Sequence, residues 1–155
     1  MEESIKAAKY LQDAGYDMLN CDNGTYDAWY WSHPGPYMPE NCNLIDAIEL
    51  KKHVSIPIVC AGRMNIDSLA IKNNEIDAVG IARPFLVDPE WVTKLLNDDM
   101  NSIKPCICCH NGCFNMAHYN GVGNDQSLKD NAGMSRCALN PKTMQSKKYK
   151  IIPTK

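Results

Sequence analysis

Apolar residues recur at helical spacing in four segments of the chain and gather in three short runs between them. The spacing predicts helices over residues 4–14, 43–53, 66–73 and 88–97. The runs predict strands over residues 16–21, 56–60 and 77–81. Ser4 is the expected N-cap of the first helix, and Gly15 is its expected stop. Because helices and strands alternate and the strands are apolar throughout, we expect an α/β fold whose parallel sheet is covered on both faces.

The regular pattern stops after Asn97. Residues 105–140 are rich in Cys, Gly, Asn and Asp and show little periodicity, and residues 142–155 form a basic, Lys-rich tail. The sequence therefore predicts an α/β part over residues 1–100, a cysteine-rich segment over residues 101–141 and a basic tail over residues 142–155.

Composition narrows the class of protein. Of the 155 residues, 45% are hydrophobic and 22% are charged, which excludes a disordered chain. The net charge is −2, so the bulk charge does not indicate a nucleic-acid partner. No apolar run approaches the roughly 20 residues of a membrane helix, and the charged start of the chain does not resemble a secretory leader. We therefore expect a cytoplasmic protein with no membrane partner.

Five of the eight cysteines fall in the last third of the chain, which indicates a reducing compartment and a metal. Cys106, Cys109 and Cys113 form a C-x2-C-x3-C run, and Cys137 follows at a distance. Four thiolates suit either a tetrahedral zinc ion or an iron–sulfur cluster. A second C-x2-C knuckle of the zinc type is missing, so the spacing favours the cluster. Cys108 is the surplus thiol.

Two of the predicted strands are each followed by a small residue and an arginine. Gly62 and Arg63 follow one strand, and Ala82 and Arg83 follow the next. Small residues let backbone N–H groups approach a phosphate, and arginine offers a bidentate fork to its oxygens. Ligands of α/β folds bind at the carboxyl ends of strands, so the pair favours one shared phosphate over two solvated loop arginines.

The loop over residues 24–37 carries five aromatic rings and one histidine. It could wall a pocket for a planar substrate, or it could fold back and bury its rings for stability. Composition does not decide between these alternatives. Tyr26 and His33 are possible proton donors in the first case. Elsewhere, His53 is expected to cap a helix, whereas His110 and His118 lie among the cysteines without being expected ligands.

Together these motifs resemble the NADH:flavin oxidoreductases of the old yellow enzyme superfamily. The similar branch is that of the iron–sulfur flavoenzymes, which includes 2,4-dienoyl-CoA reductase, 2-enoate reductase, trimethylamine dehydrogenase and bile-acid enoate oxidoreductases. The resemblance covers nearly the whole chain. It rests on residues 22–33, 57–63, 80–89 and 106–113, together with residues 137–141.

The resemblance implies a TIM (β/α)8 barrel that binds FMN, with this chain similar to about strands six to eight and the cluster segment. It implies that Gly62, Arg63, Ala82 and Arg83 hold the FMN phosphate. It also implies that a [4Fe–4S] cluster is ligated by Cys106, Cys109, Cys113 and Cys137. The implied reaction is reduction of an activated C=C bond in a small unsaturated substrate. Tyr26 aligns with the family's proton donor, and His33 is the alternative. In the parent enzyme, NAD(P)H and FAD would bind to a further domain.

The chain departs from this family in three ways. Twenty-three residues separate Cys113 from Cys137, so residues 114–136 contain an insertion. The first half of the barrel is missing, and no G-x-G-x-x-G follows the linker-like residues 147–153. Since a barrel needs about 250 residues, we expect a fragment whose partners are the remaining barrel half and the FAD/NADH domain. The alternatives are a zinc-stabilised binding module without catalysis and an inactive truncated product.

Overall fold

The computed structural model describes residues 1–64, 69–115 and 136–143. By contacts the chain divides into two compact units, Met1–Ile81 and Ala82–Lys155. The predicted domain bounds at residues 100 and 141 rest on the family resemblance and stay a prediction. Within the described residues, no helix combines the length and the apolar character needed to cross a membrane.

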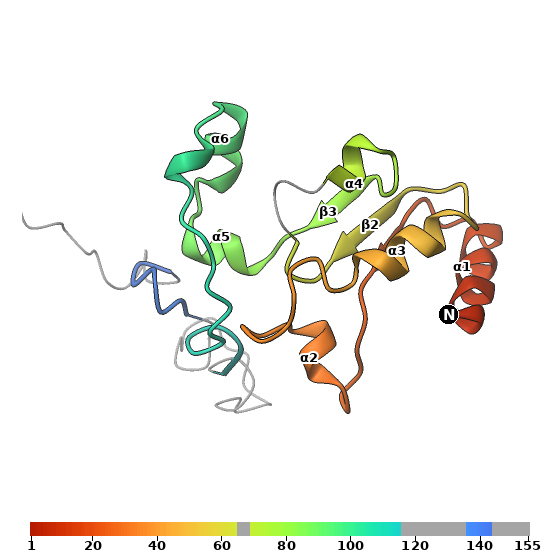
Figure 1. Cartoon of the computed structure of the whole chain (residues 1–155), viewed down its shortest axis with the longest axis horizontal. Helices are drawn as coiled ribbons and strands as arrows, with labels where there is room; N and C mark the ends of the chain where they lie inside the picture. The colour runs from red at the N-terminus through yellow and green to blue at the C-terminus, as the bar shows by residue number, and fades with distance from the viewer. Residues whose placement is uncertain (65–68, 116–135, 144–155) are drawn as a thin grey trace, which may run out of the picture. The chain divides into compact units, whose positions relative to one another are not determined.

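The first unit contains a three-stranded parallel sheet in the order β1-β2-β3, of which Figure 1 labels β2 and β3. The strands are β1 (Leu19–Cys21), β2 (Ile58–Ala61) and β3 (Ala78–Gly80). Each lies in or beside a predicted run, although all three are shorter than expected. β1 starts late because Tyr16 and Met18, inside the predicted run, are exposed.

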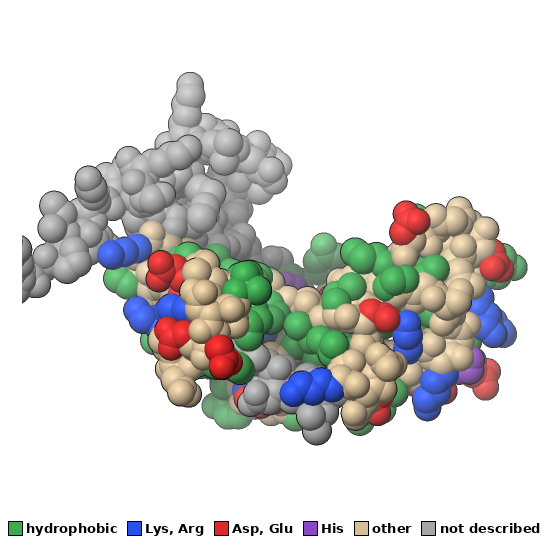
Figure 2. All heavy atoms as spheres, turned by 90° about the horizontal axis from the view of Figure 1, so that it is seen from above, with side chains coloured by type: hydrophobic (Ala, Val, Ile, Leu, Met, Phe, Trp, Pro, Cys, Tyr) green, Lys and Arg blue, Asp and Glu red, His purple; other side chains and the backbone are tan. Residues whose placement is uncertain are grey.

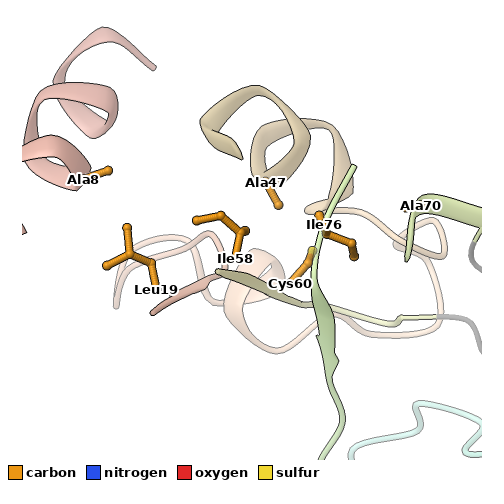
Figure 3. Close-up of a cluster of buried hydrophobic side chains, with 7 residues drawn as sticks. All are labelled: Ala8, Leu19, Ala47, Ile58, Cys60, Ala70 and Ile76. Carbon is orange, nitrogen blue, oxygen red and sulfur yellow. The ribbon is translucent and has the colours of Figure 1, made fainter. Parts of the chain in front are cut away.

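Helices α1 (Glu2–Asp13), α3 (Leu44–Lys51) and α4 (Leu69–Lys72) pack on one face of this sheet. Each contributes an alanine to the core, so the helix backbones can lie close to the strands. Figure 3 shows the core side chains, which are Ala8, Leu19, Ala47, Ile58, Cys60, Ala70 and Ile76. Burial of these side chains is the main stabilising contribution to the first unit.

The opposite face of the sheet has no comparable cover among the described residues of this unit. Asn20 is exposed there, and its neighbours on that face are only partly buried, namely Val59, Ala61, Ala78 and Gly80. The expectation of a sheet covered on both faces is therefore met on one face only. β1 and β3 are the outer strands of the described sheet.

Asp77 ties two of these elements together just before β3. Its Oδ2 accepts hydrogen bonds from Lys51 Nζ at 2.6 Å and from the backbone N–H of Ile58 at 2.7 Å. These bonds lower the pKa of the Asp77 carboxyl, the lysine having the larger effect. Asp77 therefore joins the end of α3 to the start of β2.

Several helix boundaries differ from the predictions. α1 begins at Glu2, so Ser4 is not its N-cap, whereas Gly15 follows the helix with φ +92° as expected of a stop. The predicted helix 88–97 is α6 (Trp91–Leu96), because Asp88 lies before it and accepts hydrogen bonds from Lys94 Nζ and two backbone N–H groups. The sequence did not predict three short elements: α2 (Trp29–Ser32), α5 (Arg83–Val87) and a 3-10 turn, η1 (Met100–Ser102).

Figure 2 shows charged side chains of both signs on one face of the described residues. On the coloured part of the face seen in Figure 2, acidic and basic groups are interspersed among hydrophobic ones. This distribution agrees with the small net charge of the sequence.

Candidate functional site

The turn after β2 is held by a neighbouring segment of chain. Residues 41–43 run beside residues 61–63 and donate to their backbone carbonyl groups. The contacts are Asn41 N–H to Arg63 O at 3.0 Å, Cys42 Sγ to Gly62 O at 3.6 Å and Asn43 Nδ2 to Ala61 O at 2.9 Å. These contacts hold the carbonyl groups of the turn toward the neighbouring segment, and backbone N–H groups of such a turn suit an anion.

Gly62 is required in this turn by both its conformation and its neighbour. Its φ is +121°, and a Cβ built on it would lie 2.3 Å from Nδ2 of Asn43. Asn43 is only 2% exposed, and Nδ2 also lies 3.5 Å from the backbone oxygen of Trp31. Its Oδ1 is buried and has no hydrogen-bond partner among the described residues. Asn43 therefore joins the end of β2 to helix α2 of the aromatic loop.

Arg63 follows with φ +48°, also in the left-handed region. Its Nη1 donates to backbone oxygens of the aromatic loop, at 3.1 Å to Gly35 and 3.2 Å to Pro36, and also to Met38. The side chain thus ties this loop to the strand end, a role that sequence reasoning missed. An arginine at a strand end does not by itself reveal which carbonyl groups the fold brings near it.

The second predicted arginine lies in the other unit. Ala82 precedes α5 with φ −125° and ψ −66°, and Arg83 is the first residue of that helix. Arg83 Nη1 lies 2.6 Å from Nε2 of His110. Because Arg63 and Arg83 belong to different units, a phosphate shared between them stays a prediction.

All five cysteines of the C-terminal segment line one small cavity, about 20 Å³ in volume. The lining residues include Arg83 and His110 as well as Cys106, Cys108, Cys109, Cys113 and Cys137. Cys108 and His110 have φ values of +54° and +58°, so the chain turns sharply twice around the cavity. The N–H of Cys108 donates to Sγ of Cys106 at 3.4 Å. Amide–sulfur hydrogen bonds of this kind stabilise thiolate ligands of iron–sulfur clusters.

Gly112 brings the remote Cys137 to this cavity. Its backbone oxygen accepts the N–H of Arg136 at 2.6 Å, and a Cβ built on Gly112 would lie 2.9 Å from the oxygen of Arg136. Any larger residue would push the two backbones apart. The segment after Cys137 is anchored on α5, where Leu86 O accepts two side-chain hydrogen bonds. The donors are Asn140 Nδ2 at 3.0 Å and Thr143 Oγ1 at 2.6 Å.

The donor set of this cavity fits a metal cluster in its chemistry. Four thiols at the predicted positions share the cavity with a permanent cation, Arg83. As they stand, no three Cys, His, Asp or Glu side chains in the described ranges are arranged to hold a metal ion. The pKa of the Cys106 thiol is raised by its hydrogen bond with the Cys108 side chain and by burial, whereas the charge of Arg83 acts in the opposite direction. The cysteines therefore gather where predicted, and ligation stays a prediction.

The two predicted proton donors, Tyr26 and His33, both lie beside the indole ring of Trp29. The ring centroids of Tyr26 and Trp29 are 5.4 Å apart, and those of Trp29 and His33 are 5.8 Å apart. Ser32 Oγ lies 2.9 Å from Nδ1 of His33. Tyr26 is 84% exposed and Tyr37 is 99% exposed, whereas Trp29 and Trp31 are half-buried. The loop is thus neither fully folded back nor part of the cysteine cavity or of the larger cavity described below, and its role in a pocket stays a prediction.

A larger cavity of about 330 Å³ lies between α1, β1 and α3 in the first unit. Its walls are apolar along α1, and Asp22 and Asp46 lie at its polar end, where Asp46 accepts a 2.5 Å hydrogen bond from Asn23. These carboxylates would repel a phosphate. The cavity is thus unsuited to the anionic group that the strand-end arginines were predicted to bind.

Some predictions fall elsewhere or outside the described residues. His53 follows α3 and lies 3.2 Å from Glu49, as suits a residue at a helix end. His118, nearly all of the predicted insertion and the basic tail beyond Thr143 lie outside the described residues.

Comparisons with known proteins match this chain to larger enzymes. It is 39% identical over 150 residues to cinnamate reductase of Clostridium sporogenes, and the matched stretch covers 95% of this chain and 21% of that protein. It is 28% identical over 144 residues to NADH oxidase of Thermoanaerobacter brockii, covering 91% of this chain and 20% of that protein. The chain therefore spans about a fifth of the length of these relatives.

A solved complex of 2-naphthoyl-CoA reductase with 2-naphthoyl-CoA shares the fold, with a TM-score of 0.75 at 23% identity. The similarity covers 93% of this chain and 21% of that protein. Residues 1–101 match the model of the NADH:flavin oxidoreductase / NADH oxidase family. This match includes the whole parallel sheet and both strand-end arginines. The family resemblance is thus confirmed, and the chain belongs to the NADH:flavin oxidoreductase / NADH oxidase family.

Proposed function

We propose that this chain is a segment of an FMN- and [4Fe–4S]-dependent NADH:flavin oxidoreductase that reduces an activated carbon–carbon double bond. The observation that carries the proposal is the convergence of four predicted cysteine ligands on one cavity, in a chain of this flavin family. Two relatives are named as reductases of conjugated compounds, cinnamate and 2-naphthoyl-CoA. The substrate class is accordingly a small unsaturated acid or thioester.

The sheet supports the proposal that the chain supplies strands six to eight of a (β/α)8 barrel. Its three strands are parallel, and the helices of the first unit pack on one face. A barrel places helices outside and closes the inner face with its own opposite wall. The half-open face with exposed Asn20 would then point into the barrel, where the remaining barrel half of the parent enzyme covers it.

The two strand ends would hold the FMN phosphate. Backbone N–H groups at Gly62 and Ala82 and the side chains of Arg63 and Arg83 supply the donors and the positive charge. The turn after β2 supports this role, because each of its three carbonyl groups already accepts a hydrogen bond from the protein.

Tyr26 or His33 would deliver a proton to the substrate. Both lie beside Trp29, and the exposed loop offers them to a ligand. When bound, FMN supplies hydride chemistry and the cluster supplies single electrons, while NAD(P)H and FAD would bind to a further domain of the parent enzyme. The residues of this chain contribute binding, orientation and the proton.

Anaerobic reconstitution with iron and sulfide tests the proposal on this chain. We expect a broad absorbance at about 400 nm that dithionite bleaches, as for thiolate-ligated iron. Cys137→Ser should abolish the chromophore, whereas Cys108→Ser, the matched control at the surplus thiol of the same cavity, should retain it. Binding of one zinc ion without the chromophore, or equal loss in both variants, would contradict the proposal.

A further inference from the structure

Arg83 lies at the wall of the cysteine cavity and is hydrogen-bonded to a residue of the cysteine loop. Its Nη1 lies 2.6 Å from Nε2 of His110, and both residues line the cavity with the cysteines. The phosphate role predicted for Arg83 leaves this second contact unexplained.

His110 is held in a position suited to binding this cation. Its backbone has φ +58°, its oxygen accepts the N–H of Asn115 at 2.9 Å, and its ring packs against Phe114 with centroids 5.2 Å apart. An arginine N–H can only donate, so Nε2 of His110 must accept, which places the ring proton of the neutral imidazole on Nδ1. An Nε2 that accepts from arginine is not available to ligate a metal, although His110 directly follows the predicted ligand Cys109.

We propose that His110 is a positioning residue that holds the Arg83 guanidinium against the cysteine cavity, where this fixed charge raises the reduction potential of the bound cluster. The inference rests on the proposed function, since it needs the cluster. Reduction adds one electron and hence one negative charge at the cavity. A nearby cation stabilises the reduced state more than the oxidised one, and arginine stays protonated at every working pH.

Redox titration of the reconstituted chain, followed by electron paramagnetic resonance of the reduced cluster, tests this inference. We expect Arg83→Gln to lower the ratio of reduced to oxidised cluster about tenfold at a fixed solution potential, which is about 59 mV for a one-electron couple. His110→Ala should shift the potential in the same direction by less, because the charge remains but is no longer held. His110→Gln, which keeps an acceptor, should restore most of the potential.

Lys104→Gln is the matched control. It removes one positive charge two residues before Cys106, from a side chain that does not line the cavity. We expect it to leave the potential unchanged at equal iron content. Equal shifts in Arg83→Gln and Lys104→Gln would overturn the inference while leaving the cluster in place. If Arg83→Gln does not assemble a cluster, the reduction potentials of His110→Ala and His110→Gln provide the test. An unshifted potential in His110→Ala then overturns the inference. Failure of the unmodified chain to form any cluster overturns the proposed function and this inference together.

Discussion

Substitution of Gly62 by alanine tests the packing that shapes the turn after β2. The new Cβ would lie 2.3 Å from Nδ2 and 2.9 Å from Cγ of Asn43, too close for either atom to remain in place. Asn43 is 2% exposed, so its side chain has little room to move. We expect the substitution to break the hydrogen bond from Asn43 to Ala61 O and to loosen the contact with Trp31.

Two costs add in this variant. An L-residue at φ +121° is strained by about 1–3 kcal/mol, partly offset by about 0.4–1 kcal/mol because alanine restricts the unfolded chain. Displacing Asn43 leaves a buried amide and a carbonyl group without partners, at about 1–3 kcal/mol. Urea unfolding followed by tryptophan fluorescence measures the resulting change in the free energy of unfolding, since Trp29 and Trp31 lie in the same unit as Gly62.

Gly15→Ala is the control that separates these costs. Gly15 has φ +92°, but nothing lies within 4 Å of a Cβ built on it. It therefore shares the backbone strain without the steric contact. We expect Gly62→Ala to be less stable than Gly15→Ala by about 1–3 kcal/mol, or roughly 2–12 °C in melting temperature. Equal destabilisation in the two variants would refute the role assigned to Asn43.

Three further predictions concern other contacts. The pKa of the Asp77 carboxyl is lowered, so its contribution to stability is full above the unfolded pKa of about 4 and is lost as pH falls through the lower folded value. Asp77→Asn should thus be less stable at pH 7 and show a flatter loss of stability below about pH 4 in urea titrations; an unchanged pH profile contradicts this. Thr143→Val should destabilise the second unit by about 1 kcal/mol, because the hydrogen bond from the Thr143 hydroxyl to Leu86 O is lost. Thr143→Ser keeps a hydroxyl and should not destabilise it. Equal effects of the two substitutions in thermal melts would count against that hydrogen bond. Burial raises the pKa of the fully buried Cys60 thiol to about 12. Iodoacetamide at pH 8 should therefore modify the exposed Cys109 long before Cys60, and peptide mass spectrometry would measure both labelling rates. Comparable rates would contradict the burial of Cys60.

The short apolar runs located the strands because burial on the helix-covered face requires apolar side chains there. Leu19, Ile58 and Cys60 all lie in or beside runs that the sequence marks as strands. Boundaries were less accurate, since they depend on particular tertiary contacts. Asp88 illustrates this: the sequence presents it as the start of a helix, but its carboxylate instead receives Lys94 and two backbone N–H groups, and α6 begins later.

The candidate site was predictable where spacing alone defines it. The cysteine positions follow from their intervals, and the structure places them around one cavity. The side-chain partners of the arginines were not predictable. Arg63 donates to backbone oxygens about 25 residues away, and Arg83 lies against a histidine that the sequence offered no reason to pair with it. Such contacts depend on how distant segments come together, which periodicity and spacing do not encode.

The outer strands of the described sheet have a practical consequence for work with this chain. β1 and β3 each present one row of backbone groups that pair with no strand in the described part of the chain. Edges of this kind recruit strands from other molecules, which leads to aggregation. We therefore expect the isolated chain to aggregate more as its concentration rises. Co-expression with a polypeptide that supplies the strands proposed to flank this sheet should keep the chain in solution, and size-exclusion chromatography of the two preparations would show the difference.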